Sequence, residues 1–104
     1  MNKIEKTKSA YEELGFSDAA EMQVKAQLVV RIARILRERG WSQQEAAKVI
    51  GLTQPKLSKM LRGQFRGISE AKMMDCLVRL GCSVKIVVGP EKKGASRRVE
   101  VVAA

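Results

Sequence analysis

The chain has 104 residues and a net charge of +9 at pH 7, with 20 Lys+Arg against 11 Asp+Glu, so we expect a single domain with an anionic partner. Because the sequence has no histidine and only two cysteines, it excludes His-dependent catalysis and a four-ligand zinc site, and we expect no catalytic residue, metal or cofactor. No apolar run reaches the ~20 residues that span a bilayer, and the N-terminus lacks a signal-peptide core, which predicts a cytoplasmic protein without a membrane partner.

Residues 1–16 show no regular apolar period, which predicts a flexible N-terminal arm. Large apolar side chains occur late in this arm, at Tyr11, Leu14 and Phe16. Acidic residues stand around them, so the arm combines apolar groups with negative charge.

A long helix is predicted over about residues 18–39, where apolar residues recur with the helical period. Asp18 and Glu21 have the spacing of a capping box at its start. Gly40 is expected to end the helix, because glycine readily takes the left-handed conformation that closes a helix.

Two short helices are predicted next, with little chain between them. The first covers residues 43–50 and follows a capping box formed by Ser42 and Glu45. The second follows Thr53 as its N-cap and continues to about Arg62.

The C-terminal part is predicted to contain one further helix and one strand. The helix covers residues 70–80 and is capped by Ser69. Residues 82–89 are rich in β-branched side chains that roughly alternate, which predicts a single strand. Residues 90–104 are charged and broken by glycine, which predicts a flexible tail.

Residues 43–63 have the pattern of a helix-turn-helix, whose second helix lies in the major groove of DNA. Ala46 and Ala47 are small enough for a close helix crossing, and the Gly-Leu-Thr of residues 51–53 supplies a positive φ, an apolar contact and a cap. Residues 31–66 hold nine basic and two acidic residues, a net charge of +7, which is typical of a nucleic-acid footprint. The side chains expected to face inward are Leu57, Met60 and Leu61.

The segment WSQQEAAKVIGLTQPKLSKMLRG resembles the helix-turn-helix of the phage Cro and repressor class, the XRE family. The predicted helices with one strand make the fold all-α over residues 17–81, followed by the single C-terminal strand. The resemblance covers about residues 30–80 and implies that the helical domain is lambda-repressor-like. The flanking sequences LGFSDAAEMQVKAQLVVRIARILRERG and RGQFRGISEAKMMDCLVRLGCSVKIVV extend it, and they are similar to the HigA-like antitoxin branch. The implied function is a sequence-specific transcriptional repressor.

The resemblance also implies which residues contact DNA. Gln54 matches a glutamine that reads an adenine edge, and Lys59 matches a position where lysine favours guanine. Pro55 departs from the family pattern of a polar side chain, which leaves only an apolar contact there. The expected base contacts are Gln54, Pro55, Lys56 and Lys59, and the expected phosphate contacts are Gln43, Ser58, Arg62 and Arg66.

A homodimer is expected, because one such motif reads too few base pairs to select a site in a genome. The strand of residues 82–89 has no partner strand in the predicted fold, so we expect antiparallel pairing with a second copy through Val84, Ile86 and Val88. The operator would then be an inverted repeat in double-stranded DNA. A hairpin with residues 99–102 is the alternative.

The HigA-like resemblance and the arm together predict an antitoxin that neutralises a small basic RNase. Tyr11, Leu14 and Phe16 would anchor the arm in the basic cleft of the toxin, and the carboxylates around them would complement its charge. Three alternatives stay open: these side chains cover the core of the domain itself, the lysines of the arm follow DNA, or the chain is a stand-alone repressor. An RNA-binding module is disfavoured by the 4% aromatic content.

Other conspicuous residues have ordinary structural interpretations. Cys76 and Cys82 are expected to be buried free thiols, because the cytoplasm is reducing. Trp41 is expected to pack against the start of the helix that follows it. The methionines expected in the core are Met60, Met73 and Met74.

Overall fold

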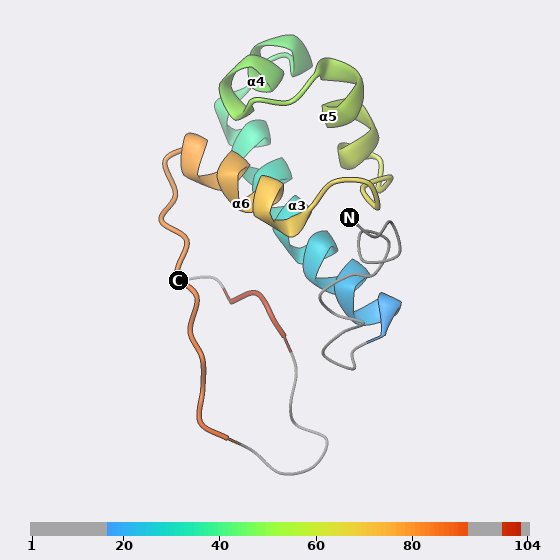
Figure 1. The fold of residues 1–104 in the computed structure, drawn as a ribbon. Coiled ribbons are helices and arrows are strands. Elements are labelled where there is room, and N and C mark those ends of the chain that lie inside the picture. The colour runs from blue at the N-terminus through green and yellow to red at the C-terminus, as the bar shows by residue number, and fades with distance from the viewer. Residues whose placement is uncertain (1–16, 92–98, 103–104) are drawn as a thin grey trace, which may run out of the picture.

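Helices supply the regular secondary structure of the described part of the chain. The computed structural model describes residues 17–91 and 99–102. Over these residues the all-α class is confirmed, and no helix is long and apolar enough to cross a membrane. The helices, shown in Figure 1, are α3 (Asp18–Arg39), α4 (Gln43–Ile50), α5 (Gln54–Leu61) and α6 (Glu70–Arg79).

Helix α3 is the base on which α5 and α6 pack. Helix α6 packs on both α3 and α4, and α5 contacts both α4 and α3. Helices α4 and α5 therefore lie together at one end of the molecule, at the top of Figure 1. Arg39 ties the ends of α3 and α6 together, because its Nη2 donates a 2.9 Å hydrogen bond to the carbonyl oxygen of Leu80. Trp41 packs against the core, with the Arg39 guanidinium 5.1 Å from the centre of its ring.

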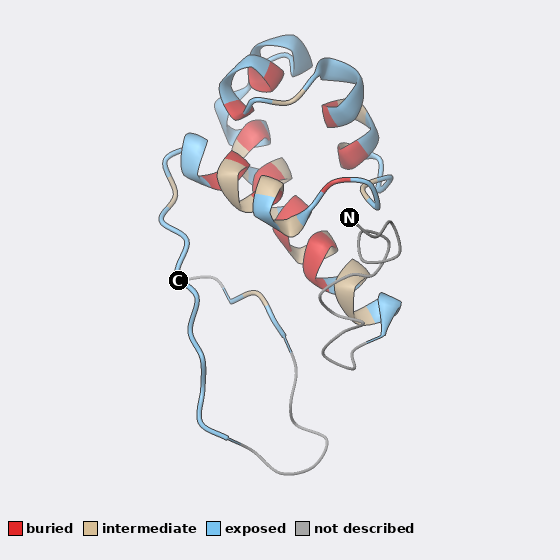
Figure 2. Ribbon diagram, in the orientation of Figure 1, coloured by how far each residue is buried: buried red, intermediate tan, exposed pale blue. Residues whose placement is uncertain are grey.

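A single hydrophobic core joins these helices. Figure 2 shows that their buried segments face one another across the centre of the helical body. Full burial of a large apolar side chain contributes about 1.5–3 kcal/mol, whereas a helix cap contributes about 1 kcal/mol, so packing stabilises this arrangement more than capping does. The large side chains that are fully buried are Ile32, Ile50, Leu57, Met60, Met73 and Cys76.

The start of α3 differs from the sequence prediction. Ser17 has extended backbone, with φ −77° and ψ 161°, and its Oγ accepts a 3.2 Å hydrogen bond from the Ala20 N–H. Ser17 is therefore the N-cap, and the predicted capping box of Asp18 and Glu21 is wrong. The reason is local: Asp18 is already the first helical residue of α3, so the side chain of Ser17, the extended residue before it, accepts the hydrogen bond of the cap. The Asp18 carboxylate instead binds Arg66, which lies far away in the sequence.

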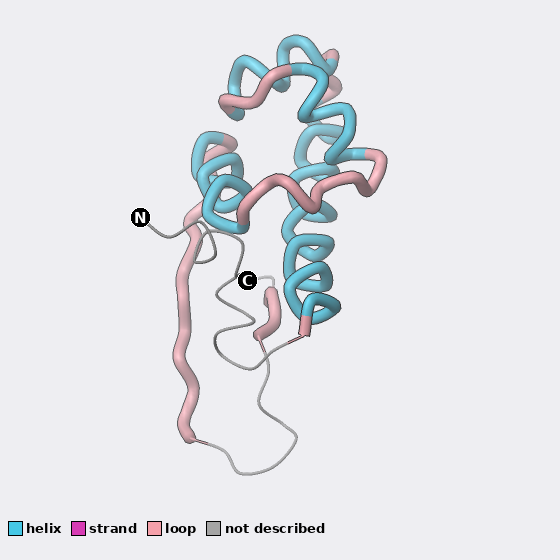
Figure 3. Tube along the Cα trace, turned by 45° about the vertical axis from the view of Figure 1, so that its right-hand side comes forward, coloured by secondary structure: helices cyan, strands magenta, loops and turns pink. Residues whose placement is uncertain are grey.

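The predicted strand over residues 82–89 is also wrong. Residues 82–91 carry no regular secondary structure, and Figure 3 shows them leaving the helical body as a loop. Val84, Ile86 and Val88 are 37%, 79% and 90% exposed. A strand needs a neighbouring strand with which to exchange backbone hydrogen bonds, and the described residues of one chain provide none.

Residues 99–102 contact α3. The Val101 N–H donates a 2.9 Å hydrogen bond to Gln27 Oε1, and the Val101 side chain packs against the core. Neither residues 82–91 nor residues 99–102 are in a strand, so the alternative hairpin is not observed either.

The cysteines are both free, but only one matches its expected burial. Cys76 is buried, and its Sγ donates a 3.6 Å hydrogen bond to a backbone carbonyl oxygen of α4. This burial raises the pKa of the Cys76 thiol. Cys82 is half-buried, because it lies where the chain leaves the helical body. Met60 and Met73 are in the core as expected, whereas Met74 is half-buried.

Candidate nucleic-acid interface

Helix α4 begins at the predicted capping box. Ser42 Oγ accepts a 3.1 Å hydrogen bond from the Glu45 N–H, and Glu45 Oε1 accepts one of 3.1 Å from the Ser42 N–H. The hydrogen bonds from the Ser42 backbone and side chain lower the pKa of the Glu45 carboxyl, so this carboxyl is ionised at neutral pH. Gln43, an expected phosphate contact, is exposed directly after this cap.

The turn between α4 and α5 has the predicted order of residues. Gly51 has φ +75°, and its N–H donates a 3.0 Å hydrogen bond to the Ala47 carbonyl oxygen. Leu52 is half-buried against the core. Thr53 then caps α5, because its Oγ1 accepts a 3.3 Å hydrogen bond from the Lys56 N–H. The positive φ, the apolar contact and the cap are thus all confirmed.

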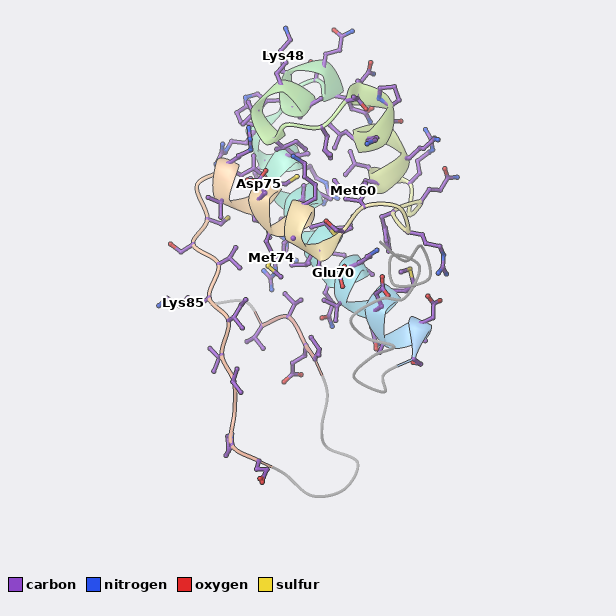
Figure 4. The ribbon with its side chains drawn as sticks, in the orientation of Figure 1. Lys48, Met60, Glu70, Met74, Asp75 and Lys85 are labelled. Carbon is purple, nitrogen blue, oxygen red and sulfur yellow. The ribbon has the colours of Figure 1, made fainter. Side chains whose placement is uncertain are left out.

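Small residues on α4 and large ones on α5 meet in the core. Ala46 and Ala47 are buried on α4, as expected for a close helix crossing. Leu57 and Met60 are fully buried on α5, and Figure 4 shows Met60 in the interior, whereas Lys48 of α4 projects into solvent. This packing fixes which face of α5 is left for a ligand.

The exposed face of α5 carries all four expected base contacts. Gln54, Pro55, Lys56 and Lys59 are exposed. Lys56 and Lys59 are three residues apart, and the exposed Arg62 follows at the same interval. Lys56 and Lys59 are therefore neighbours on the surface of α5, and Arg62, the C-cap residue, adds a third cation at the end of the helix.

Two of the expected phosphate contacts bind each other. Arg62 Nη1 donates a 2.8 Å hydrogen bond to Ser58 Oγ. Ser58 is half-buried and Arg62 is exposed. The Ser58 hydroxyl therefore orients the Arg62 guanidinium, whose outer edge stays in solvent.

Arg66, another expected phosphate contact, is held by an acidic residue of α3. Its Nη1 donates a 2.7 Å hydrogen bond to Asp18 Oδ1, and its Nη2 donates one of 3.1 Å to Asp18 Oδ2. These hydrogen bonds lower the pKa of the Asp18 carboxyl and raise the pKa of the Arg66 guanidinium, so the pair is fully charged at neutral pH. The two side chains are nevertheless 69% and 55% exposed.

Lys25 is a buried cation that no sequence motif predicted. It is 3% exposed, and its Nζ donates a 2.9 Å hydrogen bond to the Arg66 carbonyl oxygen. Its Nζ also lies 3.2 Å from Glu21 Oε2 and 3.9 Å from Glu70 Oε1, which Figure 4 labels at the start of α6. Lys25 thus joins α3, α6 and the loop that follows α5. The only sequence signal was the four-residue spacing of Glu21 and Lys25.

The loop after α5 completes a basic groove of about 730 Å³. This groove brings Lys56 and Lys59 of α5 together with Arg66 of the loop. Met22 and Phe65 contribute apolar side chains to its lining. Two expected base contacts and one expected phosphate contact therefore share a single concave surface.

Cations of α6 border the turn, although no sequence motif pointed to them. A Cβ placed on Gly51 would lie 3.3 Å from Lys72 Nζ and 3.1 Å from the Arg79 guanidinium. Asp75 Oδ2 accepts hydrogen bonds of 3.0 Å from Arg79 and 3.3 Å from Lys72. The hydrogen bond from Arg79 is the main reason that the pKa of the Asp75 carboxyl is lowered. Asp75 therefore neutralises part of the positive charge beside the turn.

Expected site residues that fall on the arm, Tyr11, Leu14 and Phe16, lie outside the described residues. Val84, Ile86 and Val88 are described, and they lie on the exposed segment rather than near α5.

Comparison with known proteins gives two findings. Residues 10–89 match a family described as a helix-turn-helix domain. A solved structure named as an XRE-family transcriptional regulator is similar to this chain with a TM-score of 0.78 and 32% sequence identity, over 85% of this chain and 100% of that chain. No curated protein matches the chain.

Proposed function

The chain belongs to the helix-turn-helix family and is a DNA-binding transcriptional regulator of the XRE type. We propose that it acts as a repressor and that α5 enters the major groove of DNA. The observation that carries this proposal is the basic groove, in which Lys56 and Lys59 of α5 stand beside Arg66. The major groove of B-DNA admits a single helix, and the buried face of α5 leaves only this polar face to enter it.

The proposed base contacts follow from the chemistry of the exposed face of α5. Gln54 presents an amide that pairs with the N6 and N7 edge of adenine, and Lys59 presents a donor for O6 and N7 of guanine. Lys56 reaches either a base or a phosphate. Pro55 offers an apolar surface that suits a thymine methyl group.

The proposed phosphate contacts surround that face. Gln43 stands at the start of α4, and Arg62 stands at the end of α5 with Ser58 as its support. Arg66 follows in the loop. Such contacts set the register of the protein on the duplex without reading its sequence.

Base reading is tested with a duplex selected from random-sequence DNA and a scrambled duplex of equal length. Lys59→Ala and Gln54→Ala should each weaken binding to the selected duplex by about 1–3 kcal/mol, and binding to the scrambled duplex by less. For a dimer with ~6–10 phosphate contacts, log K should fall with log[salt] at a slope of about −5 to −9.

Lys85→Ala is the matched control, because it removes the same charge from the loop that leaves the helical body (Figure 4). Lys85→Ala should leave the affinity for the selected duplex and the affinity for the scrambled duplex nearly unchanged. A slope near zero for the wild-type protein, or an equal loss on both duplexes with Gln54→Ala, contradicts the proposal.

A homodimer is the second part of the proposal, with Val84, Ile86 and Val88 as its interface. Their exposure supports it, because a row of β-branched side chains in solvent is unfavourable for a monomer. A two-fold dimer would present two copies of α5 to an inverted-repeat operator.

An antitoxin role is the third part, with a small basic RNase as the partner of Tyr11, Leu14 and Phe16. The support is that Ser17 caps α3 by itself, so the described domain begins without help from the arm. The arm combines apolar side chains with carboxylates, a composition that suits a basic cleft. A stand-alone repressor is the alternative function, and co-expression with the neighbouring gene separates the two.

A further inference from the structure

The contact between Asp18 and Arg66 uses the same atoms that a DNA phosphate would use. A carboxylate and a phosphate both present two oxygens to the Nη1 and Nη2 edge of a guanidinium. Asp18 occupies that edge with hydrogen bonds of 2.7 Å and 3.1 Å. We propose that Asp18 is an internal stand-in for phosphate, and that DNA binding transfers the Arg66 side chain from Asp18 to the DNA backbone. This inference rests on the proposed DNA binding.

The backbone of Arg66 is fixed independently of its side chain. Buried Lys25 donates a 2.9 Å hydrogen bond to the Arg66 carbonyl oxygen. Two carboxylates, Glu21 and Glu70, hold the Lys25 ammonium in turn. A transfer from Asp18 to phosphate therefore requires only side-chain rotation, and the loop keeps its place beside α5.

The position of Arg66 places this exchange at the proposed interface. Arg66 lines the basic groove together with Lys56 and Lys59 of α5, so the exchange would occur beside two of the proposed base contacts. Among the described residues, Asp18 is the only one whose carboxylate forms an ion pair with one of these three cations, Arg66. Its charge lowers the attraction of this groove for a polyanion.

The exchange is energetically inexpensive. Both side chains are more than half exposed, and exposed ion pairs contribute little because water screens them. Removal of the Asp18 charge should therefore strengthen DNA binding by only about two- to fivefold at low salt. The effect should vanish at high salt, because exposed charges are screened there.

The test measures binding of the full chain to a mixed-sequence duplex of about 20 base pairs, since phosphate contacts are independent of sequence. Asp18→Asn keeps the size of the side chain and leaves the Ser17 cap in place. It should tighten binding, Arg66→Ala should weaken it, and Asp18→Asn should have no effect in the Arg66→Ala background. Asp18→Ala serves as a second variant with the same expectation, and thermal unfolding checks that each variant is folded.

Glu38→Gln is the charge-matched control, because Glu38 is exposed on the same helix. It should leave affinity nearly unchanged, which separates the local contact from the general rise in net charge. If Asp18→Asn weakens binding, leaves it unchanged, or tightens it equally without Arg66, the stand-in role is wrong. If the wild-type chain binds no duplex, the proposed function fails instead.

Discussion

Lys25 shows how one buried charge organises the surroundings of the proposed interface. The side chain is buried on α3, yet it contacts Glu21, Glu70 and the carbonyl oxygen of Arg66. A buried ammonium is stable only when its charge is paired and hydrogen-bonded. Glu21 and Glu70 pair the charge, and the Arg66 carbonyl oxygen accepts a hydrogen bond. The two ion pairs and the hydrogen bond offset the cost of burying the ammonium, and they link three elements of the fold.

Lys25→Met keeps the apolar stem of the side chain but removes the charge. Glu21 and Glu70 then face each other without a cation, and the Arg66 carbonyl oxygen loses its donor. We expect a loss of about 1–3 kcal/mol in the free energy of unfolding, measured by urea denaturation.

Lys48→Met is the matched control, because Lys48 is exposed on α4. An exposed substitution of this kind should change the free energy of unfolding by about 0.5 kcal/mol or less. Equal effects of the two substitutions would show that the Lys25 contacts do not stabilise the fold.

At the scale of the elements, residues 82–91 differ from the helices in where their backbone can find hydrogen-bond partners. A helix satisfies its backbone within its own segment, whereas an extended segment requires a neighbour. Val84, Ile86, Val87 and Val88 are exposed on this segment. Pairing with a second copy would both cover these side chains and bond the backbone.

Ile86→Glu and Val87→Glu test this pairing at adjacent positions. The two side chains are 79% and 85% exposed, and successive residues of an extended chain point to opposite faces. If Val84, Ile86 and Val88 form the interface, Ile86→Glu should give a monomer in sedimentation velocity, and Val87→Glu should stay a dimer. Ile86→Glu should also lose affinity for the inverted-repeat duplex. Two variants that both sediment as dimers would place the interface elsewhere.

At the scale of the whole molecule, the described helices begin at Ser17, the N-cap of α3. The part of the core that the structure describes is built from side chains of the four helices, their connections and Val101. Deletion of residues 1–16 should therefore leave the helix-turn-helix folded. Loss of function after this deletion would then report on a partner of the arm rather than on the fold.

Co-expression with the neighbouring gene tests the antitoxin role. The full chain should restore growth of cells that make the toxin, whereas a chain that starts at Ser17 should fail to do so. The shortened chain should keep its helical circular dichroism and part of its DNA affinity. A shortened chain that protects cells equally well would show that the arm is not the inhibitory element. If the neighbouring gene is not toxic, the stand-alone repressor is the function.

Short-range patterns were sufficient to predict the helices and the turn between α4 and α5. Ser42 and Thr53 cap helices through backbone groups three residues away, and Gly51 closes α4 within its own turn. Leu57 and Met60 recur at helical spacing, so the opposite face of α5 could be identified as exposed. The information for these features lies within a few consecutive residues, and no distant contact overrides it.

Contacts between distant segments appear only in the folded chain. Asp18 and Arg66 are 48 residues apart, and Lys25 reaches the Arg66 carbonyl across 41 residues. No period or cap encodes such pairs, because helix packing decides which surfaces meet. The β-branched composition of residues 82–89 favours a strand, but a strand forms only beside another strand, and the described part of this chain supplies none.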